Sequence, residues 1–281
     1  MEQSYPHKKV KMEEDSENDK QPIVGAFDVF REELDEHHAR RERIIKKSRD
    51  ITDLSKKIIF TLHRVRGLGK PLQGKIQQDV ASRLEQIANN FSAIAPDLAG
   101  VNAWRYQWQI SPGIQEYIEA ISFKHYLETK RLITIQEVQD SVPPNVIITE
   151  PDYVLGLFDL TGELMRYAIT SIASGNDAVK RTETSDTQGQ DDQVSSHGTL
   201  GPIPSQILQD MRELRVLFEG MAVPKGSPLK KQFGSKLEVM CNSVSKVENA
   251  AFEVLVRGSE LPSGWAPDTS GRDATVGIEG Y

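Results

Sequence analysis

Two acidic side chains, Glu116 and Glu119, stand three residues apart in the segment GIQEYIEAISFKHYLETKR, residues 113–131. Apolar residues surround them at helical spacing, so the segment is predicted to form one amphipathic helix. Side chains three residues apart on a helix are neighbours, with Cβ atoms roughly 5–6 Å apart. Two carboxylates this close repel each other unless they share a cation or a proton. The pair is therefore a candidate cation site.

A second acidic pair, Asp159 and Glu163, lies four residues apart in the apolar run VLGLFDLTGELMRYAI. Two helices that contribute two carboxylates each would build a site with oxygen ligands only. Such ligands select a hard cation, Mg²⁺ or Mn²⁺, and these ions often serve phosphoryl chemistry. Spacing alone leaves an alternative open, namely that these acids lie on solvated helix faces and bind no metal, because acidic residues are common on such faces.

Other kinds of site fail on spacing. A di-iron bundle needs Glu-x-x-His pairs, but Ser122 stands three residues after Glu119. Zinc sites need clusters of Cys and His, and the six histidines here are scattered. The turn at residues 67–71 lacks the spacing and the preceding strand of a phosphate-binding loop. Cys241 lies on an apolar helix, so we expect it in the core rather than as a nucleophile.

The composition is that of a soluble globular protein, with 38% hydrophobic and 27% charged residues among 281. No apolar run approaches the ~20 residues that span a bilayer, and the first residues contain no secretory signal. A single cysteine fits a reducing compartment. The net charge of −7 argues weakly against a general nucleic-acid coat, yet residues 40–75 hold twelve Lys and Arg against three acids.

Helical periodicity runs along most of the chain, and no segment shows the alternation of a strand. The pattern predicts an all-α fold, a single-domain bundle of about seven helices over residues 23–262. Disordered or flexible segments are expected at 1–22, 174–202 and 263–281. The expected helices cover residues 26–65 (as one helix or two), 73–94, 113–131, 151–173, 203–221 and 229–256.

Three further features of the sequence admit more than one interpretation. The aromatic residues of WRYQW at 104–108 could stack on unpaired bases, but buried packing is the commoner use and is expected here. Pro112 either kinks the helix that carries Glu116 or starts a new one. The basic residues at 40–66 form either a positive flank or an ordinary solvated helix face.

Four long blocks resemble the translin-associated factor X (TRAX) branch of the translin superfamily. They are RIIKKSRDITDLSKKIIFTLHR, GIQEYIEAISFKHYLETKRLI, DYVLGLFDLTGELMR and KVENAAFEVLVRGSELP, in the family's order. The resemblance covers roughly residues 25–173 and 203–262. It implies a translin-like all-α bundle of seven helices, in agreement with the periodicity.

The resemblance also implies a function. TRAX and its partner translin form a hetero-octameric, Mg²⁺-dependent endoribonuclease that cleaves single-stranded RNA. That complex removes the passenger strand in RNA silencing and processes tRNA fragments. We therefore expect translin and single-stranded RNA as partners, Mg²⁺ (or Mn²⁺) as cofactor, no membrane association, and a location in cytoplasm and nucleus.

The family's catalytic carboxylates map by motif onto Glu116, Glu119 and Asp159, all of them metal ligands as well. Glu163, in the same motif as Asp159, is expected to support the metal, although translin-like chains also tend to carry an acid there. We expect the phosphate backbone of RNA to contact basic side chains without readout of sequence, namely Arg43, Lys46, Lys47 and Arg49.

The sequence departs from the family pattern at two places. Residues 104–106 are closer to translin than to animal TRAX, and Pro112 stands where animal TRAX commonly has threonine. Neither departure touches the three acids. The competing hypothesis is a non-catalytic helical scaffold that stabilises translin and binds single-stranded nucleic acid.

Overall fold

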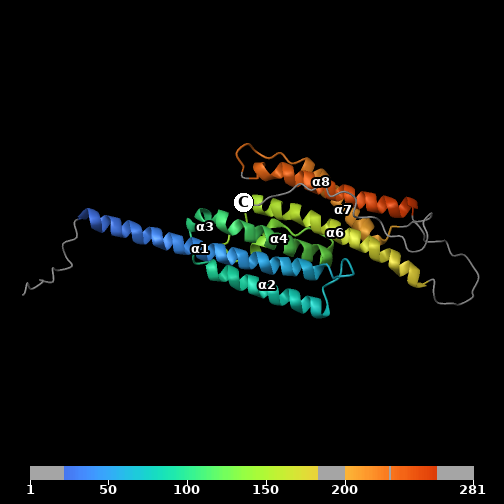
Figure 1. Cartoon of the computed structure of the whole chain (residues 1–281), viewed down its shortest axis with the longest axis horizontal. Helices are drawn as coiled ribbons and strands as arrows, with labels where there is room; N and C mark the ends of the chain where they lie inside the picture. The colour runs from blue at the N-terminus through green and yellow to red at the C-terminus, as the bar shows by residue number, and fades with distance from the viewer. Residues whose placement is uncertain (1–21, 183–199, 228, 258–281) are drawn as a thin grey trace, which may run out of the picture. The chain divides into compact units, whose positions relative to one another are not determined.

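The computed structural model describes residues 22–182, 200–227 and 229–257 (Figure 1). Every regular element in these ranges is helical, so the predicted all-α fold is confirmed. None of the described helices is long and apolar enough to cross a membrane. The predicted tails at 1–22 and 263–281 lie outside the described residues except for Pro22, as does most of the predicted insertion.

The chain separates into two compact units, Met1–Arg43 and Ile44–Tyr281, and α1 contributes residues to both. In the first unit, Phe27 and Phe30 pack edge to face, with ring centroids 6.2 Å apart, and both rings are exposed.

The helices are α1 (Pro22–Leu62), α2 (Gly74–Ile94), α3 (Asn102–Arg105), α4 (Gln107–Thr129), α5 (Ile135–Asp140), α6 (Glu150–Thr182), α7 (Pro202–Glu219) and α8 (Lys230–Phe252), with a π-helical turn, η1 (Glu253–Arg257).

Several helices differ from the sequence prediction. The short α3 and α5 were not predicted, and α6 continues to Thr182 although its predicted end was residue 173. The segment at 174–182 has no apolar periodicity, and periodicity reports which face is buried rather than whether the backbone is helical. A capping box between Thr134 and Glu137 starts α5, since each residue's side chain bonds the other's backbone N–H.

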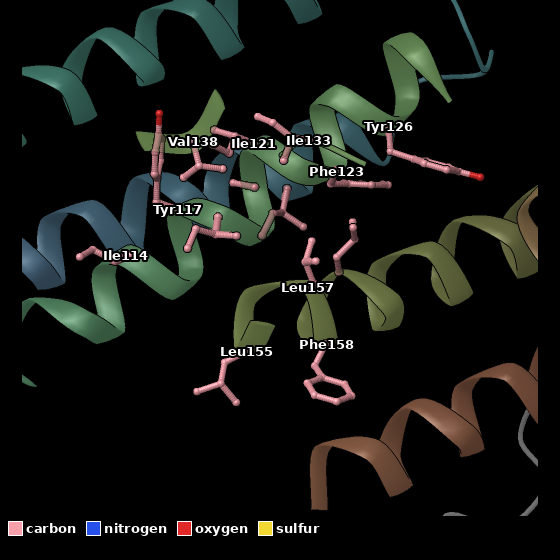
Figure 2. Close-up of a cluster of buried hydrophobic side chains, with 14 of the residues drawn as sticks. Ile114, Tyr117, Ile121, Phe123, Tyr126, Ile133, Val138, Leu155, Leu157 and Phe158 are labelled. Carbon is pink, nitrogen blue, oxygen red and sulfur yellow. The ribbon is translucent and has the colours of Figure 1, made fainter. Parts of the chain in front are cut away.

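In the second unit, α4 packs between α1 and α6, and α6 in turn packs on α7 and α8. Phe123 of α4 packs edge to face on Tyr167 of α6, with ring centroids 6.0 Å apart, whereas Ile121 lies on the side of α4 toward Val138 of α5 (Figure 2). Phe158, on the side of α6 away from α4, stacks on Phe218 of α7, with ring centroids 4.2 Å apart. These contacts make α4 and α6 the centre of the core.

Two glycines allow α4 to lie unusually close to its neighbours. A Cβ on Gly113 would lie 2.8 Å from the backbone O of Ser48 in α1. A Cβ on Gly156 of α6 would lie 2.7 Å from Ile118 Cγ2 and 3.0 Å from the backbone O of Gln115, both in α4. Because real Cβ atoms do not approach this closely, each position requires glycine for close backbone packing.

Pro112 lies inside α4, which begins at Gln107 rather than at the predicted residue 113. A buried carboxylate, Asp152 at the start of α6, stabilises this end of α4. It accepts hydrogen bonds from Gln107 (2.8 Å), Gln115 (2.8 Å) and Ser111. These bonds tie the turns on both sides of the proline to α6, so α4 continues through Pro112 as one helix.

The expectation that the aromatic residues at 104–108 are all buried was wrong. Tyr106 is buried, but Trp104 and Trp108 are 65% and 77% exposed. The break between α3 and α4 falls at Tyr106, whose backbone is not helical (φ −106°, ψ 10°). With the ring of Tyr106 in the core, the two tryptophans on either side of it face solvent.

Replacement of Gly156 by alanine tests the close approach of α4 and α6. The overpacking is expected to lower the free energy of unfolding by about 1–3 kcal/mol, despite the better helix propensity of alanine. Gly162→Ala is the matched control, because a Cβ at Gly162 of the same helix meets nothing within 4 Å. It is expected to raise the free energy of unfolding by up to about 1 kcal/mol. Urea unfolding measures both, and equal shifts of the same sign would contradict the argument.

Candidate functional site

The four predicted acids form one electrostatic group at the contact of α4 with α6. Glu116 and Glu119 come from α4, and Asp159 and Glu163 come from α6. Asp159 and Glu163 each raise the pKa of Glu116 and of Glu119, which shows that the charges of the two helices lie within interaction range. Glu119 and Glu163 are buried, and the other two acids are half-buried. The two acidic motifs therefore lie near each other, and their role as a site stays a prediction.

Glu119 is the least compensated member of this cluster. Its side chain is 9% exposed, and it makes no hydrogen bond or ion pair with any residue that the structure describes. Burial raises its pKa to about 8, and the charges of Glu116, Asp159 and Glu163 add to the effect. Burial also raises the pKa of Glu116, while the nearby Lys56 opposes that shift. The charge of Lys236 opposes the shift but is its smallest cause, so the pKa of Glu119 stays raised.

The other three acids have cationic partners. Lys236 of α8 forms an ion pair with Asp159. Lys56 Nζ of α1 lies 3.9 Å from Glu116 Oε2.

Glu163 is held from two sides. Arg166 Nη1, one turn further along α6, donates to both of its carboxylate oxygens at 2.8 Å. His63, just after α1, bonds the same carboxylate. Lys236, Lys56 and Arg166 neutralise Asp159, Glu116 and Glu163 in part, and none of these three cations forms an ion pair with Glu119.

Lys236 and His63 are neighbours of the acids that the sequence reasoning missed. They lie 77 and 100 residues from their acidic partners along the chain. One signal was present for Lys236: it occupies a position on the apolar stripe of α8 formed by Phe233, Leu237 and Met240. A charged residue at such a position needs a partner, because burial of an unpaired charge is costly.

The four acids offer only carboxylate oxygens, the ligand type that hard cations prefer. Across the described residues, no group of three or more His, Cys, Asp or Glu side chains is arranged so that it could hold a metal ion. Lys236, His63 and Arg166 bond oxygens of Asp159 and Glu163. Glu119 is nevertheless buried and unpartnered beside three other acids, and a divalent cation would reduce the electrostatic repulsion among them. The candidate ligands are Glu116, Glu119, Asp159 and Glu163, and as the structure places them they do not form a metal site.

A family model described as the translin family matches residues 39–258. The chain belongs to the translin family. Translin-associated protein X of Rattus norvegicus is 31% identical over 92% of this chain and 87% of that protein. The Translin-associated protein X homolog of Schizosaccharomyces pombe is 32% identical over 83% of this chain and 89% of that protein. These relatives confirm the resemblance to TRAX that the motifs indicated.

Solved structures agree on the fold of this translin-family chain. The crystal structure of apo-NeC3PO matches with a TM-score of 0.56 over 82% of this chain and 96% of that chain, at 16% identity. The crystal structure of AfC3PO matches with a TM-score of 0.54 over 82% and 97%, at 21% identity. The predicted translin-like bundle is therefore confirmed at the level of the fold.

The structure shows where the predicted RNA-binding residues lie without testing their contact with RNA. Lys46 and Arg49 are exposed on α1, and Arg43, in the first unit, is exposed as well. Lys47 donates to Asn90 Oδ1 of α2 (2.8 Å) and lies 3.6 Å from Asp50, so its ammonium group is already engaged. The role of these four residues stays a prediction.

Cys241 is half-buried on α8 rather than in the core. Its thiol donates to Glu219 Oε1 at 3.5 Å. Burial raises its pKa first, and the bond to Glu219 raises it further. A raised thiol pKa reduces the thiolate fraction, so the prediction that Cys241 is not a nucleophile agrees with its surroundings.

The uncompensated charge of Glu119 makes stability depend on pH. Its folded-state pKa is raised from 4.5 to about 8, so its contribution is fully present below pH 4.5 and is lost as the pH rises to about 8. Glu119→Gln removes the buried charge. Without divalent cations, this variant is expected to be more stable than the wild type near pH 8, by on the order of a few kcal/mol.

Urea unfolding in the presence of a chelator, near pH 5 and near pH 8, measures this effect. The advantage of Glu119→Gln should shrink at the lower pH. Glu85→Gln, which removes an exposed carboxylate on α2, is the control for loss of a charge. An advantage of the same size at both pH values would contradict the buried-charge explanation.

Proposed function

We propose that this chain is the catalytic subunit of a Mg²⁺-dependent endoribonuclease that cleaves single-stranded RNA in a hetero-oligomer with translin. The observation that supports this most strongly is the group of four coupled carboxylates, in which Glu119 is buried and unpartnered. Membership of the translin family and the similarity to Translin-associated protein X point to the same function.

In this proposal the carboxylates of Glu116, Glu119 and Asp159 hold the cation. The chemistry that Mg²⁺ supplies when bound is stabilisation of charge on phosphate oxygens and activation of a water molecule. Arg166 and His63 keep Glu163 fixed beside the three acids, so Glu163 has a supporting role. Lys236 holds Asp159 in place from α8. The rigid contact of α4 with α6 therefore orients the ligands before substrate binds.

The same proposal places the chain in the pathways that its resemblance to TRAX implies. These are removal of the passenger strand in RNA silencing and processing of tRNA fragments, in cytoplasm and nucleus. A hetero-octamer with translin is the proposed form.

One observation favours a second candidate function, a scaffold that stabilises translin and binds single-stranded nucleic acid without cleaving it. Asp159 and Glu163 are already paired with Lys236, His63 and Arg166. An acidic group neutralised by its own chain needs no metal. The scaffold offers no reason, however, for an unpartnered carboxylate at Glu119, because a buried neutral residue there would be more stable.

Substitution of the acids separates the two candidates. Glu119→Gln and Asp159→Asn, co-purified with translin, are each expected to lower cleavage of single-stranded RNA in Mg²⁺ by more than about 100-fold. Assembly with translin should survive, because neither substitution changes the packing volume much. Glu85→Gln is the control, an exposed acid outside the cluster.

A gel assay of labelled RNA measures cleavage, with and without a chelator. Full activity in both cluster variants, or activity that survives the chelator, would contradict the proposed nuclease and favour the scaffold.

A further inference from the structure

A groove of about 500 Å³ lies between α1 and α2, entirely within the unit Ile44–Tyr281. Its wall combines four cationic side chains with one aromatic ring. They come from α1, the turn after it and α2, and are Lys56, Lys57, Arg64, Arg83 and Phe60. Lys56, Lys57 and Arg64 belong to the basic region 40–66 but were not among the four residues named for RNA contact, and Arg83 lies outside that region.

Phe60 is 75% exposed, although a buried Phe side chain gains about 1.5–3 kcal/mol over an exposed one. Lys56 precedes it by four residues and Arg64 follows it by four, so all three share one side of the chain at the groove. A ring between cations is the combination that holds unpaired nucleotides, because bases stack on the ring and phosphates pair with the cations.

Arg83 is held in position at the wall of the groove. Its Nη1 donates to Thr61 Oγ1 (3.3 Å) and to the backbone O of Asp79 (3.0 Å). A guanidinium group has five N–H donors, so others stay available for a phosphate. Asp53 and Asp79 also line the groove, and four cations against two carboxylates leave a formal surplus of two positive charges. The groove therefore favours an anionic ligand.

The groove borders the acidic cluster through Lys56, which lines the groove and lies 3.9 Å from Glu116. We propose that the groove binds the segment of single-stranded RNA next to the phosphodiester at the acids. Phe60 stacks on an unpaired base, and Lys57, Arg64 and Arg83 contact the backbone phosphates. Duplex RNA is excluded, because its bases are already stacked and paired. This inference rests on the proposed function, since it names the path of that enzyme's substrate.

Binding to the complex of this chain with translin tests the groove. The probe is a labelled oligouridylate, followed by fluorescence anisotropy in a chelator so that no cleavage occurs. Phe60→Ala is expected to weaken binding by about 5- to 150-fold, and Phe60→Trp is expected to keep it. The same strand without bases should bind Phe60→Ala and wild type equally. Phe252→Ala is the matched control, an exposed Phe at the end of α8.

The phosphate contacts have a separate readout. In a plot of log Kd against log salt, Lys57→Ala/Arg64→Ala is expected to reduce the slope by about 0.7 for each lost contact. Lys231→Ala/Lys246→Ala removes the same charge from exposed positions of α8 and should leave the slope unchanged.

Each outcome decides the matter. If Phe60→Ala binds oligouridylate like the wild type, or weakens assembly with translin instead, the ring is not an RNA platform and the groove proposal is overturned. If Glu119→Gln is inactive while both groove variants bind normally, the proposed function stands and the groove fails. If Glu119→Gln still cleaves, the proposed function fails, and a loss of binding in Phe60→Ala still supports the groove.

Discussion

The close approach of α4 and α6 is the constraint on which the site depends. Gly156 permits it, because any Cβ there would collide with Ile118. The approach brings two acids of α4 within range of two acids of α6, in surroundings that bury Glu119. Packing energy therefore stabilises an arrangement that electrostatics alone would oppose. Because the fold holds these four carboxylates near one another, their mutual repulsion is the physical reason to expect that a cation binds there.

The rest of the second unit compensates for this repulsion from a distance. Lys236 of α8 pairs with Asp159. His63, just after α1, and Arg166, one turn beyond Glu163 on α6, both bond Glu163. Each pairs with an acid other than Glu119. The helices that surround α4 and α6 thus position counter-charges as well as the core, and they leave one carboxylate uncompensated. Lys56 extends this network from the acids to the groove between α1 and α2.

Local patterns in the sequence predicted much of this structure. The i,i+3 and i,i+4 spacing of the acids, set in apolar runs, identified both helices and all four members of the cluster. Helical periodicity located α1, α2, α7 and α8 closely, because those helices each bury one face. It missed the extension of α6 and the short α3 and α5, since none of them depends on a long apolar stripe.

Features that depend on tertiary contacts could not be predicted in the same way. The exposure of Trp104 and Trp108 follows from the break at Tyr106, which no residue type signals. The partners of the acids come from segments far apart in sequence, and the spacing of residues within one helix gives no information about which distant segments meet in the fold. The groove beside Phe60 likewise requires two helices to be placed side by side. The sequence alone therefore predicts the four acids, whereas their partners and the groove can be identified only from the folded structure.

Binding of a divalent cation tests the central claim most directly. Isothermal titration calorimetry of the complex with translin, using Mn²⁺ in place of Mg²⁺, reports the cation without reference to activity. The account predicts saturable binding to the wild type and to Glu85→Gln, and strongly weakened binding to Glu116→Gln, Glu119→Gln and Asp159→Asn. Equal Mn²⁺ binding in all five proteins, or none in the wild type, would contradict it.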